Sequence, residues 1–150
     1  MNANHLFQLK CSVQHYPWGA KKQNGHEPYI AELLNVRSSS HPYAELWIGA
    51  HQKLPASVIC ENRKETPLSD MIAANPREIL GSGLVDKNVN SLPFLLKVLD
   101  CASPLSIQAH PDKKTAEKLH SNDPAHYPDE NHKPEIAVGI KGMEAFCQFR

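Results

Sequence analysis

Three residues whose side chains can bind a divalent metal ion occur in the second half of this 150-residue sequence. Gln108 and His110 are two positions apart, so in a strand both side chains point to one face, about 7 Å apart. Glu135 follows Pro134, which stiffens the chain that approaches it. An amide oxygen, an imidazole and a carboxylate leave a metal open to an oxygen-rich substrate, unlike a closed structural zinc site. Spacing alone leaves a second interpretation open, a strand with one solvated face.

Two lysines near these residues could supply positive charge. Lys97 stands within Pro93–Leu99, the most apolar run of the chain, which we expect to be a buried strand. A charge there is costly unless it has a partner. We therefore predict that Lys97 faces a ligand cavity with a counter-charge nearby, and not bulk water. Lys133 stands two residues before Glu135. From the residues alone, Lys133 could equally be a solvated charge on a loop.

The elements that must position these side chains are mainly short strands. Alternation and turn residues predict strands over residues 7–13, 45–49, 55–60, 93–99 and 105–110, and a closing hairpin over 135–140 and 144–149. Thr66 as N-cap, the spacing of Leu68 and Ile72, and an Asn75–Glu78 capping box ended by Gly81 predict two short helices over 67–80. A further helix is expected from Pro111 to His120, a loop over 81–91, and either a strand or a helix over 29–35.

Composition and charge exclude several classes of protein. Sixteen basic and sixteen acidic residues give no net charge and no basic cluster, so we expect no nucleic-acid or anionic-membrane partner. No apolar run approaches the roughly 20 residues that span a bilayer, and the first residues lack the pattern of a secretory signal. We therefore expect a cytoplasmic protein. The four cysteines form no CxxC pair and are expected to be buried small side chains. The last residues continue an apolar strand pattern, which is typical of a truncated chain.

Four segments together resemble type I phosphomannose isomerase, over essentially the whole chain and in the family's order. Within them, the blocks IQAHPDK and NHKPE are highly specific, and the four segments are Tyr16–Gly19, Ala44–His51, Pro93–Lys113 and Asn131–Glu135. The resemblance implies a mainly β, cupin-type jelly-roll fold, incomplete in this chain, with a short helical insertion at about 66–81. Residues 1–150 would then be the N-terminal part of a metal-binding catalytic domain.

The resemblance also implies roles for individual residues. Three of them match three of the family's four zinc ligands, with one Zn²⁺ per chain: Gln108, His110 and Glu135. The family's fourth ligand, a histidine, and an arginine implicated in catalysis lie beyond position 150. Other positions match the polar residues of the family's sugar-phosphate pocket, with Lys97 and Lys133 as the catalytic cations and Ser106, Trp18 and Glu45 as substrate-binding residues. Trp18 could instead be a structural filler, and Glu45 and Trp47 could be packing residues.

The implied activity is the interconversion of mannose 6-phosphate and fructose 6-phosphate through a metal-stabilised enediol, as part of mannose metabolism. A small sugar phosphate is then the ligand, and we expect the full-length protein to be a monomer. Two alternatives remain open: a non-catalytic metal-binding cupin or sugar-phosphate binding module, and a chain with no stable fold. We expect little or no isomerase activity from the isolated 150 residues.

Overall fold

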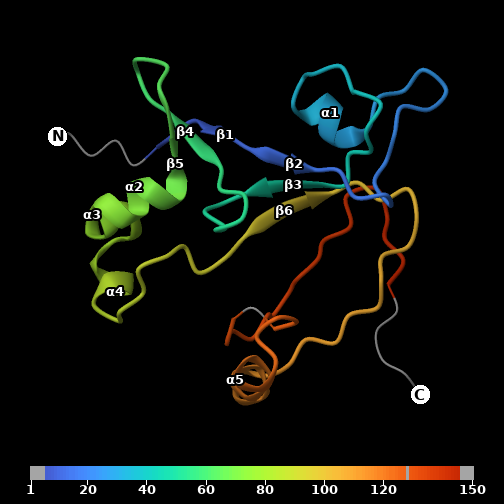
Figure 1. Ribbon diagram of the computed structural model, residues 1–150. Helices are drawn as coiled ribbons and strands as arrows, with labels where there is room; N and C mark the ends of the chain where they lie inside the picture. The colour runs from blue at the N-terminus through green and yellow to red at the C-terminus, as the bar shows by residue number, and fades with distance from the viewer. Residues whose placement is uncertain (1–5, 128, 146–150) are drawn as a thin grey trace. The chain divides into compact units, whose positions relative to one another are not determined.

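The computed structural model describes residues 6–127 and 129–145 (Figure 1). The chain divides into two compact units. The first unit is Met1–Leu105 and the second is Ser106–Arg150. Among the described residues, every strand lies in the first unit, whereas the second contains one helix. None of the helices in the described residues is long and apolar enough to cross a membrane.

Two antiparallel sheets of three strands each form the framework of the first unit. Strands β1 and β2 are separated only by Cys11, so one extended segment supplies a strand to each sheet, as Figure 1 shows. The first sheet has the order β1-β4-β5, with bounds Leu9–Lys10, Ser57–Ile59 and Glu65–Pro67. The second has the order β2-β3-β6, with bounds Ser12–Gln14, Glu45–Ile48 and Leu96–Leu99. The strands predicted over 45–49 and 55–60 are thus confirmed.

Helix α1, Tyr29–Leu33, carries part of the core of the second sheet. Ile30 and Ala31 are fully buried and pack with Tyr43 and Leu46. The sequence left this segment open between strand and helix. The buried pair and the bond from the Glu32 amide to the Pro28 carbonyl, at 3.0 Å, establish the helical form.

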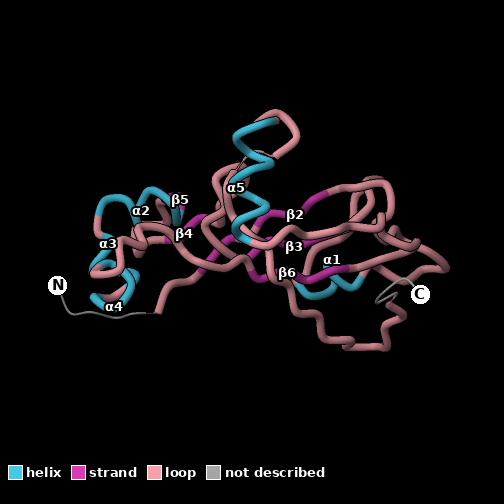
Figure 2. Tube along the Cα trace, turned by 90° about the horizontal axis from the view of Figure 1, so that it is seen from below, coloured by secondary structure: helices cyan, strands magenta, loops and turns pink. Residues whose placement is uncertain are grey.

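Three short helices follow β5, and Figure 2 shows them grouped together. The two predicted helices are confirmed, because Leu68 and Ile72 bury one face against Val58 of β4. Gly81, with φ of 81°, ends the second of them, as predicted. Part of the predicted loop is instead a further helical turn. The bounds are Leu68–Ala74 for α2, Pro76–Leu80 for α3 and Ser82–Val85 for α4.

The two predicted N-terminal caps are wrong. Thr66 lies inside β5, where its backbone pairs with Val58, so it cannot act as the N-cap of α2. Pro67 occupies that position without a side-chain bond. The side chain of Asn75 makes no capping hydrogen bond at α3, so the capping box is not formed. Both helices therefore depend on packing more than on local capping.

Four predicted strands also differ in the structure or lie partly outside its described residues. Residues 105–110 and 135–140 form no strand in the described chain, and residues 146–149 of the predicted hairpin lie outside it. Strand β6 covers only part of 93–99, and its Leu96 and Leu99 are exposed, which corrects the expectation of a buried strand. A strand requires a hydrogen-bonding neighbour, and alternation within one segment carries no information about whether that neighbour is present.

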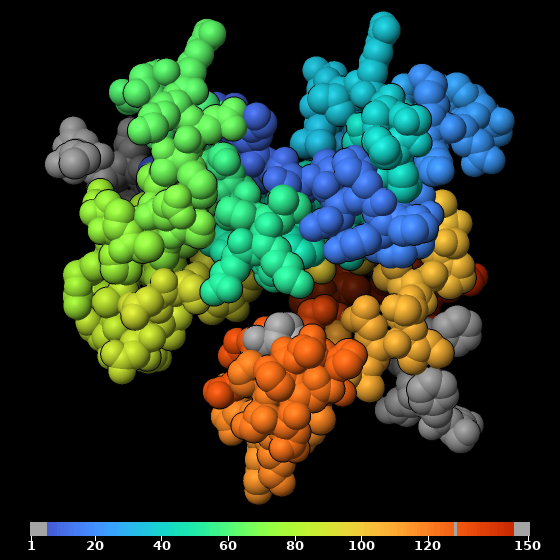
Figure 3. All heavy atoms as spheres, in the orientation of Figure 1, coloured from blue at the N-terminus to red at the C-terminus, as the bar shows by residue number. Residues whose placement is uncertain are grey.

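Helix α5, Lys113–Asn122, is the regular element of the second unit in its described residues. It confirms the predicted helix. The Asp112 side chain accepts a hydrogen bond from the Thr115 amide at 2.7 Å and caps the N-terminus. Ala116 is buried, while most of the helix is exposed and forms the orange surface in Figure 3.

The expectation of buried cysteines is wrong for Cys101, which is exposed; Cys11 and Cys60 are half-buried. Cys147 lies outside the described residues. Burial raises the pKa of the Cys11 thiol above its ordinary value. Desolvation raises the pKa of Cys101 as well, and the charges of Asp100 and Glu45 add to that increase. These raised values keep both thiols protonated and correspondingly unreactive near neutral pH.

Candidate active site

The three predicted metal ligands lie close together in the second unit. His110 Nε2 is 3.2 Å from Gln108 Oε1, and His110 Nδ1 is 3.8 Å from Glu135 Oε2. The pair Gln108 and His110 is brought together by an extended backbone rather than by a paired strand. Glu135 comes from a segment 25 residues further along the chain. The amide oxygen of Gln108 and the carboxylate of Glu135 thus lie next to the two ring nitrogens of His110.

This donor set fits a divalent transition metal. Imidazole nitrogen and carboxylate oxygen are ordinary zinc ligands, and the carboxylate supplies negative charge. The side chains of Gln108 and Glu135 are exposed, so packing does not prevent either from turning towards an ion. Within the described residues no three His, Cys, Asp or Glu side chains gather into a metal-binding group. A site here therefore depends on the Gln108 amide as its third donor.

Lys133 and Ser106 belong to the same unit as these donors. The Lys133 ammonium is 3.1 Å from Glu135 Oε1, so this lysine is ion-paired rather than a free loop charge. Both side chains are about half exposed, which keeps the energy of the pair small. Ser106 is exposed at the start of the unit.

A second group of predicted site residues lies in the first unit. Glu45 on β3 is buried, and its Oε2 is 3.1 Å from the Lys97 ammonium on β6. The Lys97 side chain is only 27% exposed, so the prediction of a shielded lysine with a counter-charge is confirmed. That it faces a ligand cavity stays a prediction.

The register of the second sheet explains this pairing. Trp47 lies directly opposite Lys97, and Glu45 lies opposite Leu99, so Glu45 and Lys97 are diagonal neighbours. Alternation also puts Glu45 and Trp47 on one face of β3. The Trp47 indole Nε1–H donates to Glu45 Oε2 at 2.5 Å. Sequence reasoning left Trp47 as a packing residue and missed this contact.

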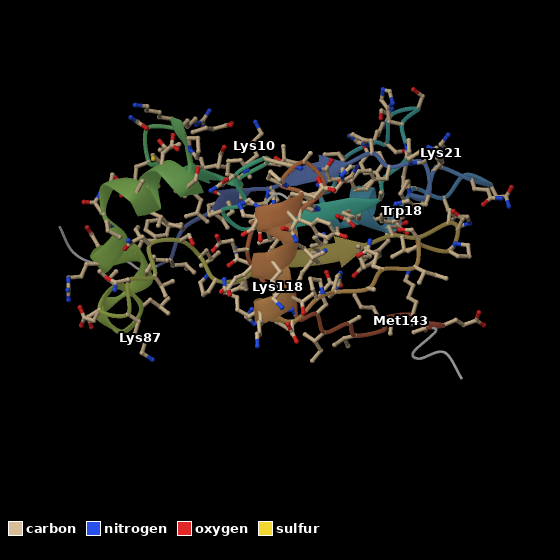
Figure 4. All side chains as sticks on the ribbon, turned by 60° about the horizontal axis from the view of Figure 1, so that its bottom comes forward. Lys10, Trp18, Lys21, Lys87, Lys118 and Met143 are labelled. Atoms are coloured by element: carbon tan, nitrogen blue, oxygen red, sulfur yellow. The ribbon has the colours of Figure 1, made fainter. Side chains whose placement is uncertain are left out.

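Trp18 comes from the loop that follows β2, where it is labelled in Figure 4. It is half-buried, and its ring stacks on Tyr16 with 5.8 Å between ring centroids. Its carbonyl accepts a hydrogen bond from the Ala102 amide at 2.9 Å. The next residue, Gly19, lies against Ala44, which precedes Glu45, a predicted substrate-binding residue.

Three other histidines have partners in the structure. The His51 ring meets Trp47 edge-on, with 4.8 Å between ring centroids. His120 Nδ1 is 2.6 Å from the Tyr127 carbonyl oxygen. His126 Nδ1 is 2.8 Å from Asp123 Oδ2, at the C-terminal end of α5. The last two contacts are local, so they serve the end of the helix rather than a metal site.

Comparisons with known proteins match essentially the whole chain to one family. The family described as phosphomannose isomerase type I, catalytic domain, matches residues 6–150. The mannose-6-phosphate isomerase of Ogataea parapolymorpha is 44% identical over 99% of this chain. The proteins of that name from Candida albicans and Homo sapiens are 41% and 42% identical over all of it. The chain spans 35–36% of the length of these relatives.

Solved structures give the same result for the fold. A mutant of phosphomannose isomerase from Salmonella typhimurium matches with a TM-score of 0.70 and 37% identity, over 83% of this chain and 32% of the other. A mannose 6-phosphate isomerase bound with zinc and yttrium matches with a TM-score of 0.69 and 35% identity, over the same shares. The class to which these matches point is that of the sugar-phosphate isomerases. Within it, this chain belongs to the type I phosphomannose isomerase family.

Proposed function

We propose that this chain carries the metal-binding part of an isomerase that interconverts mannose 6-phosphate and fructose 6-phosphate. The observation that carries the proposal is the contact of Gln108, His110 and Glu135, within a chain that belongs to the family. The ligand is a small sugar phosphate, and the full-length protein is a monomer. A non-catalytic binding module would share the metal ligands, so turnover is the property that separates the two functions.

Gln108, His110 and Glu135 hold one Zn²⁺ per chain. Zinc bound there supplies a Lewis acid for the oxygens on C1 and C2 of the sugar. The bound zinc of one family structure supports this choice of metal. Before zinc binds, the Lys133 ammonium already lies against the carboxylate of Glu135. This ion pair restrains the side chain of a proposed zinc ligand that is not held by packing.

The reaction moves a proton between C2 and C1, and negative charge develops on the neighbouring oxygens. Lys97 and Lys133 each offer an ammonium to that charge or to the phosphate. Ser106 donates a hydroxyl hydrogen bond to the phosphate, and Trp18 and Glu45 bind the sugar. Glu45 suits this role because its position is fixed by two donors. The base that removes the proton is not assigned.

For the fold, we propose a cupin-type jelly-roll, of which residues 1–150 form the N-terminal part and residues 66–81 a helical insertion. Two antiparallel three-stranded sheets support the jelly-roll, because that architecture consists of antiparallel strands in two sheets. The short helices α2 and α3, placed between β5 and β6, support the insertion.

A coupled assay tests the activity. Fructose 6-phosphate formed from mannose 6-phosphate with zinc is measured for this chain and for a chimera extended by the C-terminal part of the Candida albicans relative. We expect turnover by the chimera and at least 10²-fold less by the 150 residues, because an exposed site leaves charge interactions screened by water. An inactive but folded chimera that still binds zinc would favour the binding module instead.

Metal binding is tested separately by native mass spectrometry. We expect His110→Ala to lose zinc, while His126→Ala, a change of the same kind in the same unit, retains it. Undiminished zinc in His110→Ala would reject the ligand assignment whatever the activity of the chimera.

A further inference from the structure

Glu45 is the one buried charged or polar residue among those the structure describes, with 8% of its surface exposed. A buried carboxylate is costly unless donors compensate it. Two donors meet the same oxygen, Oε2: the Trp47 indole N–H at 2.5 Å and the Lys97 ammonium at 3.1 Å. Trp47 is thus one of two groups that satisfy this carboxylate.

Trp47 also contacts Lys97 directly. The Lys97 ammonium lies over the Trp47 ring, 4.9 Å from its centroid, which is within the range of a cation–π contact. The two residues are cross-strand partners, so the backbone fixes their separation. The same indole therefore contacts the Glu45 carboxylate through its N–H and the Lys97 ammonium through its ring face.

The indole itself is held in place by its surroundings. Trp47 is 7% exposed, and the His51 ring packs edge-on against it. A bulky side chain with two torsions loses little entropy when it is fixed in this way. Removing the indole would leave Glu45 with a single donor and would leave the Lys97 stem without its aromatic support.

We propose that Trp47 is a positioning residue that holds the carboxylate of Glu45 and the ammonium of Lys97 in the orientation in which they meet the substrate. This role goes beyond packing, because it depends on the N–H and the ring face and not on volume alone. The proposal rests on the proposed function in one respect, namely that the ligand of this pair is a sugar phosphate.

The chain has two tryptophans, so the indole region of a proton–nitrogen NMR spectrum contains two signals, which Trp18→Phe assigns. An indole N–H donated to a carboxylate resonates downfield. We expect the Trp47 signal to move upfield in Glu45→Gln, where the acceptor loses its charge. We expect the ε-methylene protons of Lys97 to be shifted by the ring and to lose that shift in Trp47→Leu.

Trp47→Phe keeps an aromatic ring and loses the N–H, so it separates the two contacts. We expect Lys97 to retain part of its ring-current shift in this variant, and mannose 6-phosphate, titrated into the chimera, to bind about tenfold more weakly. The matched control is Leu46→Ala, which removes a buried side chain from the opposite face of β3. It should leave the Trp47 and Lys97 signals in place.

Unchanged Lys97 signals in Trp47→Phe and Trp47→Leu, or equal changes in Leu46→Ala, would overturn the proposal. If Trp47→Leu does not fold, the Glu45→Gln spectrum and the Trp47→Phe variant still decide the matter. Lys97 signals that depend on Trp47 but do not respond to mannose 6-phosphate would uphold the positioning role and contradict the proposed function.

Discussion

Gly19 is the position where the smallest substitution should have the largest effect on the candidate site. A Cβ at this residue would lie 2.6 Å from both Cα and N of Ala44, and 2.7 Å from its Cβ. Side-chain rotation cannot relieve contacts to backbone atoms. Ala44 is fully buried, so the strand that begins at Glu45 would have to move away from the loop that carries Trp18.

The cost of Gly19→Ala has two parts. Inserting one methyl group into a packed interior costs about 1–3 kcal/mol. The displaced segments are also joined by the paired bonds of Ala20 and Tyr43, at 2.7 Å and 3.1 Å, and loss of one such bond costs about 1 kcal/mol more. We therefore expect the free energy of unfolding to fall by about 2–4 kcal/mol.

Urea unfolding followed by tryptophan fluorescence measures this change, because both tryptophans belong to the first unit. Two alanine substitutions serve as controls. In Gly83→Ala the new Cβ meets nothing within 4 Å, so helix propensity should stabilise α4 by up to about 1 kcal/mol. Gly25→Ala also has open space but requires φ of +81°, which should cost about 1–2 kcal/mol. A midpoint for Gly19→Ala equal to that of the wild type would refute the steric argument.

Two further predictions concern carboxylates. Bonds from Lys22 and from Ser38 lower the pKa of Glu27 from 4.5 to about 2, so its charged form stabilises the fold above pH 4.5, and this stability is lost as the pH falls towards 2. Acid titrations of Glu27→Gln should lack that part of the loss, and curves that coincide with the wild type would contradict the assignment. The Thr115 amide and hydroxyl lower the pKa of Asp112. Asp112→Ala should destabilise α5, seen as lost helical circular dichroism, whereas Asp112→Asn should retain the cap.

The elements predicted correctly from the sequence are those whose signal is local. Leu68 and Ile72 are one helical turn apart and do share a buried face. The helix expected from Pro111 to His120 is present as α5. In contrast, residues 105–110 alternate as a strand does and yet pair with nothing in the described chain. Alternation states which face a side chain would take, whereas a partner strand is supplied from elsewhere in the fold.

The residues of the candidate site also divide into those that a local pattern predicts and those that depend on a distant part of the chain. Gln108 and His110 could be placed together from a spacing of two, and their contact at 3.2 Å follows from an extended backbone alone. Glu135 was added as a third candidate ligand because its carboxylate follows Pro134, and the resemblance strengthened that assignment. The role of Trp47 could not be predicted, because it depends on the register of β3 against β6, which no pattern within either strand specifies. The only sequence signal for this role was the Glu-x-Trp spacing, which puts both side chains on one face of a strand. That spacing is equally typical of two packing residues.

The two lysines of the candidate site share an electrostatic property that bears on ligand binding. Lys97 lies 3.1 Å from Glu45, and Lys133 lies 3.1 Å from Glu135. Their positive charges are therefore already balanced before an anion arrives. A phosphate that binds either ammonium must compete with a carboxylate, and that competition is stronger at Lys97, where the pair is shielded from water. A carboxylate that Trp47 and Lys97 both hold cannot easily turn away. We conclude that a ligand of Lys97 must approach an intact Glu45–Lys97 pair, whereas at Lys133, whose pair is half exposed, it can replace the carboxylate.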